Sequence, residues 1–301
     1  MATTVTAPVG NTIALAEKYL PILDEIYKAG AKSSVLDTVA ERVRWEGAKK
    51  AYLFNTEMVG LAGYDRNAGF VPGDVDTGWE DYEITQDRGR SFMIDAMDND
   101  ETLGMAFGTL VGEFERTQVI PELDAYRFAK YAGAAAAAQV KTETVSAANI
   151  LGYIDDATAA LDDAEVPYEG RILFVNPNTY KFIKGGVTRM VMNRDDNVNY
   201  NVEMFNDMQV ITVPSGRFNT AVTINAPTTS AAAGGYTATG DAINYMIVHP
   251  SAVLQVVKHQ IPRIFSPEVN QEADAWKFDY RVYHDCWVKA QKTNGIYVSH
   301  A

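Results

Sequence analysis

The sequence has little of the chemistry on which many enzymes depend: a single cysteine, Cys286, and four histidines in 301 residues. One cysteine excludes an intrachain disulfide and is typical of a reducing compartment. The histidines lack zinc-ligand spacing to one another and to the cysteine. Phosphate-binding glycine loops and a nucleophile elbow are also missing. We therefore expect no catalytic residue, no metal site and no cofactor.

Long apolar runs and positive charge are scarce as well. No stretch approaches the ~20 apolar residues of a membrane-spanning helix, and the N-terminus lacks the pattern of a signal peptide, so we expect no contact with a membrane. The formal net charge of -13 argues against nucleic-acid binding through the general field of the protein. With 47% hydrophobic residues, the chain can bury a large core, enough for two linked domains.

One long helix, from Asp98 to about Tyr131, is the main element that the pattern predicts; we call it the spine helix. Its apolar residues recur at intervals of three and four, on one face up to Phe114 and on two faces beyond it. Because Pro121 cannot donate to the carbonyl four residues earlier, we expect a kink near Thr117. A helix that is apolar on two faces is covered on two sides.

A long two-stranded hairpin is predicted before the spine helix. Its strands are Lys50–Val59 and Asp81–Ile94, joined by the glycine-rich segment Gly60–Gly78. A hairpin of this length is marginally stable alone in water, so it must pack on something else. We predict an apolar face and, on the second strand, charges that either pair with another chain or keep a solvated edge from aggregating. The predicted subunit-interface residues are Tyr52, Phe54, Tyr82, Ile84, Asp87, Arg88 and Arg90.

The remaining pattern alternates between helix and strand, which indicates an α/β layer. A helix from Asn11 to Gly30 packs either on its own domain or on a neighbour, and periodicity leaves both open. Further along, we predict a helix over 146–164, a buried strand over 171–175, a helix from Pro177 that stops at Gly185–Gly186, strands over 208–213 and 243–248, a surface excursion over 217–241, and strands over 277–298 with a tight turn at Asn294–Gly295.

Two groups of residues invite a chemical interpretation that the pattern does not favour. The acidic residues of Asp74–Asp81 and the polar run Asn193–Asn197 do not match the calcium-loop spacing, so solvated turns are the favoured interpretation. His284 and Cys286 share a face in a strand, but no third residue marks an orienting group. A buried structural cysteine is therefore favoured over a nucleophile.

Several runs, in a fixed order, resemble the major capsid proteins of tailed bacteriophages, which share the Hong Kong 97 fold. The resemblance covers roughly residues 30–301, and the order of the motifs makes it specific because each motif alone is weak. The runs are QDRGRSF (86–92), DAMD (95–98), VIPELDAY (119–126), VP (166–167), RIL (171–173), YHDCW (283–287) and GIY (295–297).

This resemblance implies an α+β chain in which a long hairpin, the extended loop, lies over the adjacent subunit. A peripheral domain would hold the spine helix, and an axial domain would gather around the centre of the capsomer. Mapped here, the expected parts are an N-terminal arm (1–30), the peripheral domain in three pieces (31–45, 96–140 and 250–301), the extended loop (46–95) and the axial domain (141–249).

The function implied by the resemblance is structural and non-enzymatic. Copies would form the hexamers and pentamers of an icosahedral head that encloses double-stranded DNA without sequence-specific binding. The head would assemble in the host bacterial cytoplasm, become part of the virion, and have portal and decoration proteins as partners. An encapsulin-like compartment with enzyme cargo is the alternative. A soluble enzyme would need converging ionisable residues, which we do not find.

Two departures from the family pattern matter. Some members form isopeptide cross-links through a lysine of the hairpin, but the tip Gly60–Gly78 has no lysine and the nearest are Lys49 and Lys50. We therefore do not expect that cross-link. Some members also carry a long N-terminal scaffolding region, whereas about 30 residues precede the expected domain start here. A separate scaffolding protein, or none, is implied.

Overall fold

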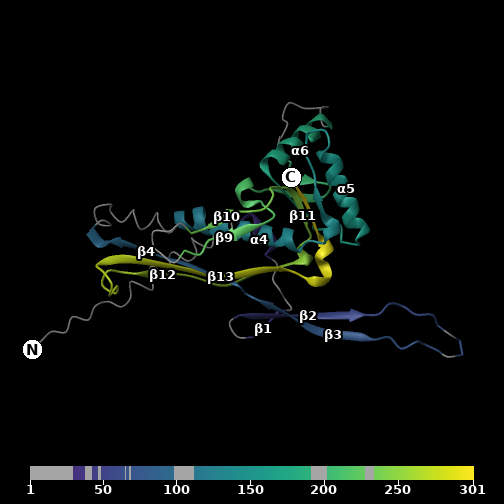
Figure 1. Cartoon of the computed structure of the whole chain (residues 1–301), viewed down its shortest axis with the longest axis horizontal. Coiled ribbons are helices and arrows are strands. Elements are labelled where there is room, and N and C mark those ends of the chain that lie inside the picture. Colours follow the sequence, from purple (N-terminus) through teal and green to yellow (C-terminus); the bar gives the residue numbers. More distant parts are fainter. Residues whose placement is uncertain are drawn as a thin grey trace, which may run out of the picture.

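The structure is a computed structural model, and it is elongated (Figure 1). A six-stranded sheet with helices α5 and α6 lies at one end, and a three-stranded sheet with helix α4 extends from it. The predicted helix over 11–30 and the first half of the predicted spine helix lie outside the described residues. The structure describes residues 30–37, 43–46, 49–64, 66–67, 69–97, 112–190, 202–227 and 234–301.

The six-stranded sheet is buried on both faces. Helices α5 (Ile150–Asp163) and α6 (Pro177–Met190) cover one face, and α4 (Ile120–Ala134) contributes Phe128 and Tyr131 to the core under the other. The two central strands therefore consist entirely of buried residues, as expected for strands covered twice. In spatial order the strands are β5 (Val140–Thr142), β14 (Ile296–His300), β11 (Ile243–Val248), β6 (Ile172–Val175), β8 (Met208–Thr212) and β7 (Met204–Phe205).

The predicted helices of this region are present, with one correction. The apolar face of α5 is fully buried, as the pattern predicted. The predicted stop of α6 at Gly185–Gly186 is wrong, because the helix continues to Met190. A Cβ on Gly186 would lie 2.8 Å from Cδ1 of Leu151. This glycine therefore allows α6 to pack closely on α5, and it does not end the helix.

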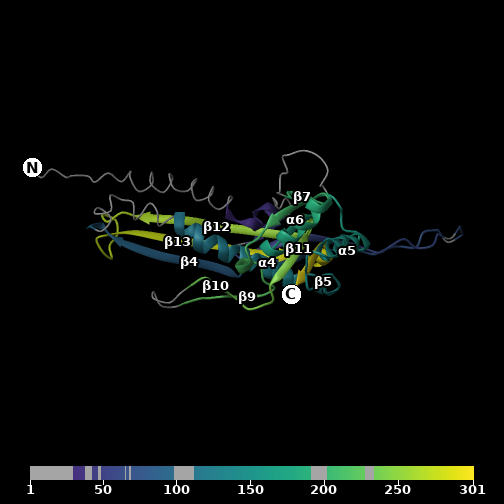
Figure 2. The ribbon, with the colours of Figure 1, turned by 90° about the horizontal axis from the view of Figure 1, so that it is seen from above.

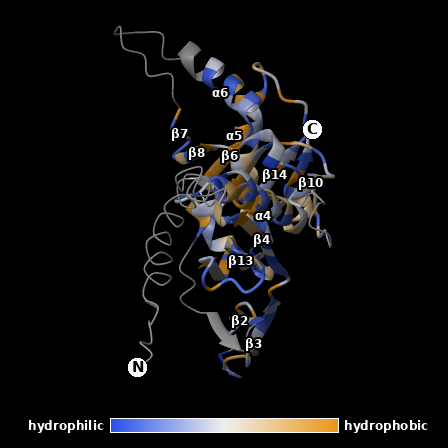
Figure 3. Cartoon of the chain, turned by 90° about the vertical axis from the view of Figure 1, so that its left-hand side faces the viewer, coloured by the Kyte–Doolittle hydropathy of each residue, from blue (hydrophilic) through white to orange (hydrophobic). Residues whose placement is uncertain are grey.

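The three-stranded sheet lies beside the spine helix (Figure 2). Its order is β12 (Val253–Phe265), β13 (Ala275–Val288) and β4 (Gln86–Asp95), all antiparallel. Alternate residues of β13 face the helix, where Phe278, Tyr280 and Val282 form a core with residues that precede α4. Hydrophobic segments gather between the layers when the molecule is viewed from its end (Figure 3).

The spine helix is irregular near the place predicted from Pro121. Helix α4 is preceded by a π-helical turn, η2 (Glu115–Val119), and the hydroxyl of Thr117 donates to the carbonyl of Glu113 at 2.7 Å. A proline that cannot complete the regular ladder is a common cause of such a change. The helix is also covered on a further side, where Leu123 packs near Ala31, so the two-sided covering is confirmed.

A short 3₁₀ helix, η1 (Lys32–Leu36), is fastened to the spine helix by a buried carboxylate. Asp124, which is 0% exposed, accepts hydrogen bonds from the backbone N–H groups of Lys32 and Ser33 at 3.0 and 3.1 Å and from the Ser33 hydroxyl at 2.7 Å. Arg217, in η4 (Ser215–Arg217), approaches the same carboxylate at 3.3 Å. One side chain therefore joins three segments that are distant in sequence.

Two strand predictions are corrected. The second hairpin strand, predicted over Asp81–Ile94, is two separate strands: β3 (Val75–Glu83) pairs with β2 (Lys50–Met58), and β4 pairs with β13. The turn predicted at Asn294–Gly295 lies in a 3₁₀ helix, η6 (Ala290–Gly295). The final strand, β14, then joins the six-stranded sheet beside β11.

The remaining strands form two small sheets. Strand β1 (Val43–Glu46) pairs with β2 and completes the hairpin sheet. Strands β9 (Val222–Ile224) and β10 (Tyr236–Ala238) pair with each other within the predicted surface excursion.

Candidate subunit interface

The β2–β3 hairpin carries large apolar side chains on one face. Residues that lie directly opposite each other in an antiparallel pair point to the same face, and the register pairs Phe54 with Trp79 and Met58 with Val75. The exposed fractions of these side chains are 46, 49, 74 and 56% respectively. The rings of Phe54 and Trp79 meet edge to face at 5.3 Å. The hairpin therefore presents an aligned apolar strip, Phe54–Trp79–Met58–Val75, to its surroundings.

The connection at the end of the hairpin extends this strip. Leu61 and Phe70 are almost fully exposed, and Tyr64 packs on Phe70 with ring centroids 4.8 Å apart. The hairpin points away from both sheets (Figure 1). An exposed apolar surface of this kind marks an interaction site more often than it marks a free surface.

The base of the hairpin, in contrast, packs on its own chain. Ile84 is 3% exposed, and Tyr82 lies against Trp287 with ring centroids 5.4 Å apart. Burial, together with a hydrogen bond to Glu80, raises the pKa of Tyr82 above its ordinary value. Tyr82 also pairs with Ala51, which puts it on the face opposite Phe54. The prediction of one shared apolar face is therefore wrong for Tyr82.

Tyr52 is half-buried on β2, on the same face as Phe54. Its place at a subunit interface, like that of the other predicted interface residues, stays a prediction. The structure adds Met58, Val75 and Trp79, which the sequence analysis missed. The available signal was the alternation of Val75, Thr77 and Trp79, which the sequence analysis overlooked because it assigned 60–78 to the glycine-rich connection and began the second strand at Asp81.

The three charged residues predicted on the hairpin lie on β4, in the three-stranded sheet, so their placement on an exposed ribbon is wrong. Arg88 makes a two-pronged ion pair with Glu122 of the spine helix, at 2.6 and 3.1 Å, and also donates to the carbonyl of Asn225 at 2.8 Å. Asp87 pairs with Arg281 of the next strand at 2.6 and 2.8 Å. Both ion pairs lie within one chain.

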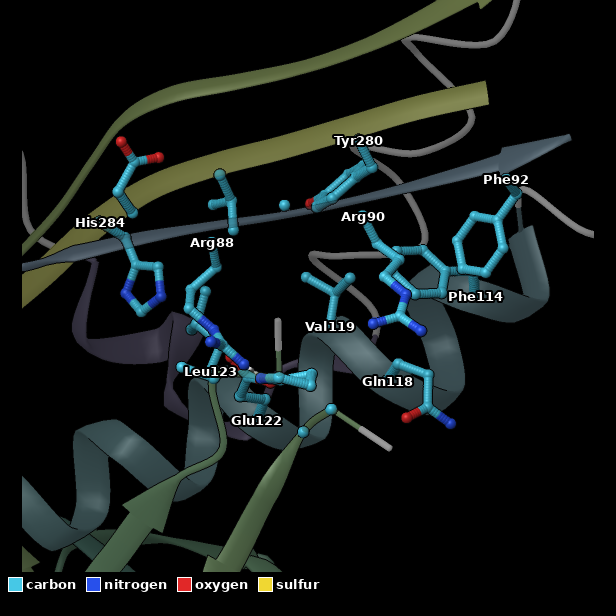
Figure 4. A pocket seen from close by; sticks show the side chains of 17 residues that line it. Arg88, Arg90, Phe92, Phe114, Gln118, Val119, Glu122, Leu123, Tyr280 and His284 are labelled. Carbon is cyan, nitrogen blue, oxygen red and sulfur yellow. Dashed lines mark hydrogen bonds and ion pairs between the residues drawn. The ribbon is translucent and has the colours of Figure 1, made fainter. Parts of the chain in front are cut away.

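Arg90 lines a cavity of about 590 Å³ between β4, β13, the spine helix and the end of the β9–β10 hairpin (Figure 4). Aromatic and aliphatic side chains, among them Phe92, Phe114 and Val119, form one part of its wall. The ion pair of Arg88 and Glu122 forms another part. The cavity therefore lies along the edge strand β4, between points where the sheet and the helix are in contact.

The buried thiol of Cys286 and the buried imidazole of His284 are both kept in their neutral forms. Burial raises the pKa of the Cys286 thiol to about 12, and burial, aided by the charge of Arg127, lowers the pKa of His284 to about 4. A thiol that stays protonated is a poor nucleophile.

Among the described residues, no group of three His, Cys, Asp or Glu side chains is placed to hold a metal ion. Within the same ranges, no helix has the length and apolar character needed to cross a membrane.

The fold is that of tailed-phage capsid proteins of the Hong Kong 97 type, as solved structures show. The mature capsid of bacteriophage PhiM1 aligns with a TM-score of 0.64 and 12% identity, over 100% of this chain and 90% of that one. The capsid of cyanophage P-SCSP1u aligns with a TM-score of 0.61 and 12% identity, over 88% and 86%. A structure from Gordonia phage Cozz aligns with a TM-score of 0.55 and 13% identity, over 89% and 86%. Neither a family model nor a curated protein matches the chain.

Proposed function

We propose that this chain is a major capsid protein, a structural and non-enzymatic subunit that assembles with its own copies into an icosahedral phage head around double-stranded DNA. The observation that carries the proposal is the projecting hairpin, whose apolar strip Phe54–Trp79–Met58–Val75 stays exposed on the single chain. A two-stranded ribbon gains little stability by itself. A neighbouring copy in a closed shell covers such a strip, whereas a solitary subunit leaves it in water.

The outer face of the three-stranded sheet is the surface that best fits a neighbour's hairpin. The register puts Met93, Lys277 and Phe265 side by side across the three strands, on the face away from the spine helix. Met93 is 54% exposed, and charges of both signs lie nearby, because Arg281 is paired with Asp87 and Arg263 lies opposite Asp279. The hairpin is acidic, with Asp74, Asp76, Glu80 and Asp81. Individual charged groups at the rim of the two surfaces would set the register of the contact.

The direction of the hairpin supports a head-to-tail contact. The hairpin and the far end of the three-stranded sheet leave the body on opposite sides (Figure 1). A contact between unlike surfaces closes into a ring when the rotation per subunit permits it. Hexamers and pentamers are such rings, and they are the capsomers that we propose for this chain.

The domain assignment follows from this arrangement. We place the extended loop at about 49–84, because β4 belongs to the three-stranded sheet. The peripheral domain then holds the spine helix with β4, β12 and β13, and the axial domain holds the six-stranded sheet, including β14. The N-terminal arm stays at about 1–30.

The remaining partners are proposals that rest on the capsid function. The net charge of -13 suits a wall that encloses DNA without binding it tightly. Assembly would take place in the host bacterial cytoplasm, with portal and decoration proteins completing the virion.

The decisive experiment removes the exposed strip without touching the base of the hairpin. The double variant Phe54→Ser/Trp79→Ser should keep the far-ultraviolet circular dichroism of the subunit and fail to sediment as shells. Met204→Ser is the matched control, because Met204 is 63% exposed on β7, the edge strand of the six-stranded sheet and not part of the hairpin, and it should assemble normally. Shells formed by the double variant would overturn the assignment of this surface to assembly.

The contents of particles purified from the native source separate the capsid from the encapsulin-like alternative. A phage head holds double-stranded DNA that a nuclease cannot reach, whereas an encapsulin-like compartment holds an enzyme. Protein cargo in place of DNA would contradict the proposed function.

A further inference from the structure

The hairpin leaves the body of the molecule at two residues, Ile84 and Thr85, between β3 and β4. The backbone of Ile84 is held on both sides: its N–H donates to the carbonyl of Lys49 at 2.9 Å, and its carbonyl accepts from the hydroxyl of Tyr283 at 3.1 Å. Its side chain is buried beside Trp287. Ile84 therefore fixes where the hairpin begins.

The next residue, Thr85, is bound by the carboxylate of Asp285. One carboxylate oxygen, Oδ2, accepts both the backbone N–H and the hydroxyl of Thr85, each at 2.8 Å. The other oxygen, Oδ1, accepts the hydroxyl of Tyr126 and the backbone N–H of Cys286, also at 2.8 Å each. Asp285 is 0% exposed, so these are charge-assisted hydrogen bonds shielded from water.

The two carboxylate oxygens bind two different elements of the molecule. Oδ2 binds Thr85, where the hairpin leaves the body, and Oδ1 binds helix α4 through Tyr126. A carboxylate that is planar and bound on both oxygens cannot follow one partner without losing the other. A shift of the helix at Tyr126 is therefore passed to Thr85, and from there to the direction of the hairpin.

We propose that Asp285 is a positioning residue that sets the direction of the β2–β3 hairpin and couples it to the spine helix. This role accounts for a buried carboxylate at the centre of the run YHDCW (283–287), between the buried residues His284 and Cys286. The effect on shell formation rests on the proposed function, whereas the effect on the direction of the hairpin does not.

The chain offers a matched control for the loss of a buried carboxylate. Asp124 is also 0% exposed and also lies at the spine helix, but it binds η1 through Lys32 and Ser33. Its hydrogen bonds do not reach the hairpin. Asp124→Asn and Asp285→Asn should therefore both lower the stability of the subunit, and only Asp285→Asn should loosen the hairpin.

The direction of the hairpin is measured directly by spin-label distances in dissociated subunits. One label is placed at Leu61→Cys, at the end of the hairpin, and the other at Asp163→Cys, at the end of α5; both positions are exposed, and the buried Cys286 stays unlabelled. We expect a narrow distance distribution for the otherwise unchanged chain and for Asp124→Asn. We expect a clearly broader one for Asp285→Asn and for the milder variant Thr85→Val.

Coupling to the spine helix is tested by the exchange of the Thr85 amide. Tyr126→Phe removes a hydroxyl of helix α4 that contacts both Asp285 and the Thr85 side chain, and it leaves both donors of Thr85 intact. Exchange at Thr85 should rise by about tenfold in Tyr126→Phe, the equivalent of weakening one hydrogen bond to a charged acceptor. Unchanged exchange in this variant would overturn the coupling, and it would do so even if Asp285→Asn failed to fold.

Shell formation provides the last readout. At temperatures where Asp285→Asn and Asp124→Asn have equal fractions folded, Asp285→Asn should yield fewer closed shells, or irregular ones. Equal distance distributions in the two variants would refute the positioning role. Failure of the unchanged chain to form shells would instead refute the proposed function, and the distance and exchange results would still decide the role of Asp285.

Discussion

The buried histidine gives the chain a defined response to acid. His284 lies under the spine helix, with the ring of Tyr126 at 5.7 Å. Burial, Arg127 and Arg88 lower its pKa to about 4, and the charge of Asp285 opposes them. Between pH 6.5 and 4 the unfolded chain therefore binds a proton that the folded chain does not. The contribution of His284 to the free energy of unfolding is fully present above pH 6.5 and is lost as the pH drops towards 4.

We expect His284 to contribute about 3 kcal/mol to this loss, as an upper value. His284→Gln replaces the ring by a neutral side chain of similar reach, so the free energy of unfolding should depend less steeply on pH in this window. Denaturant unfolding at a series of pH values measures the slope. Equal slopes for the two chains would show that His284 is already protonated in the folded state.

Cys286 should be inert in the folded chain. It is fully buried, and its pKa of about 12 leaves the thiol protonated at neutral pH. A small thiol reagent should therefore fail to label it, while Leu61→Cys, at an exposed position, is labelled rapidly under the same conditions. Cys286→Ser should still assemble, with a loss of about 1–3 kcal/mol from burying a hydroxyl. Rapid labelling of Cys286 would contradict its burial.

At the scale of elements, the sequence predicted those parts whose pattern is local. The buried face of α5, the short buried strands β6 and β11, and the irregular spine helix near Pro121 each follow from periodicity or from one residue's chemistry. These elements are covered by neighbours on the faces that the pattern marked as apolar. These elements could therefore be predicted without knowing which segments cover them.

Other elements depended on distant partners, and periodicity could not find them. Asp81–Ile94 alternates throughout, yet the chain turns at Thr85 because Asp285, 200 residues later, binds that residue. Gly186 looked like a helix stop because its close contact with Leu151 was not visible in the sequence. The hairpin strip was predicted only in part, because Val75 was assigned to the connection and the second strand was started at Asp81, after Trp79.

The ion pair between β4 and the spine helix supports the fold of the subunit. The side chains of Arg88 and Glu122 are 20% and 16% exposed, and their geometry is two-pronged. Arg88→Glu should therefore lower the free energy of unfolding by about 2–4 kcal/mol, because it leaves two carboxylates facing each other. Thermal and denaturant unfolding of the subunit measures this loss.

The ion pair between Asp87 of β4 and Arg281 of β13 is the matched control. Asp87 and Arg281 are 44% and 62% exposed, so Arg281→Glu should lower the free energy of unfolding much less than Arg88→Glu does. If Arg88→Glu unfolded no more easily than Arg281→Glu and yet failed to assemble, Arg88 would belong to the subunit interface, as the sequence had suggested.

At the scale of the whole molecule, the exposed surfaces lie where a repeating assembly needs them. The apolar strip is on the projecting hairpin, and the outer face that exposes Met93 is on the sheet that extends the other way (Figure 1). One surface cannot cover the other within a single chain of this shape. Two unlike surfaces at opposite ends instead allow each copy to cover the next.

Shells built in this way should be held by non-covalent contacts alone. The connection Gly60–Gly78 has no lysine, and Lys50, at the base of the hairpin, lies 3.6 Å from Asp81 of its own chain. An isopeptide bond needs a lysine that reaches a neighbour, and a lysine at the base stays close to its own body. The apolar strip must then supply the strength of the contact, through burial of about 25 cal/mol per Å² of apolar surface.

Purified particles that are boiled in SDS with reductant should therefore run as one band near the chain mass of 33.1 kDa. Particles treated first with a lysine-reactive cross-linker are the control, and they should give a ladder of multimers on the same gel. A ladder without the cross-linker would show a covalent link between subunits. Its mapping by mass spectrometry would then reveal whether Lys49 or Lys50 reaches a neighbour after all.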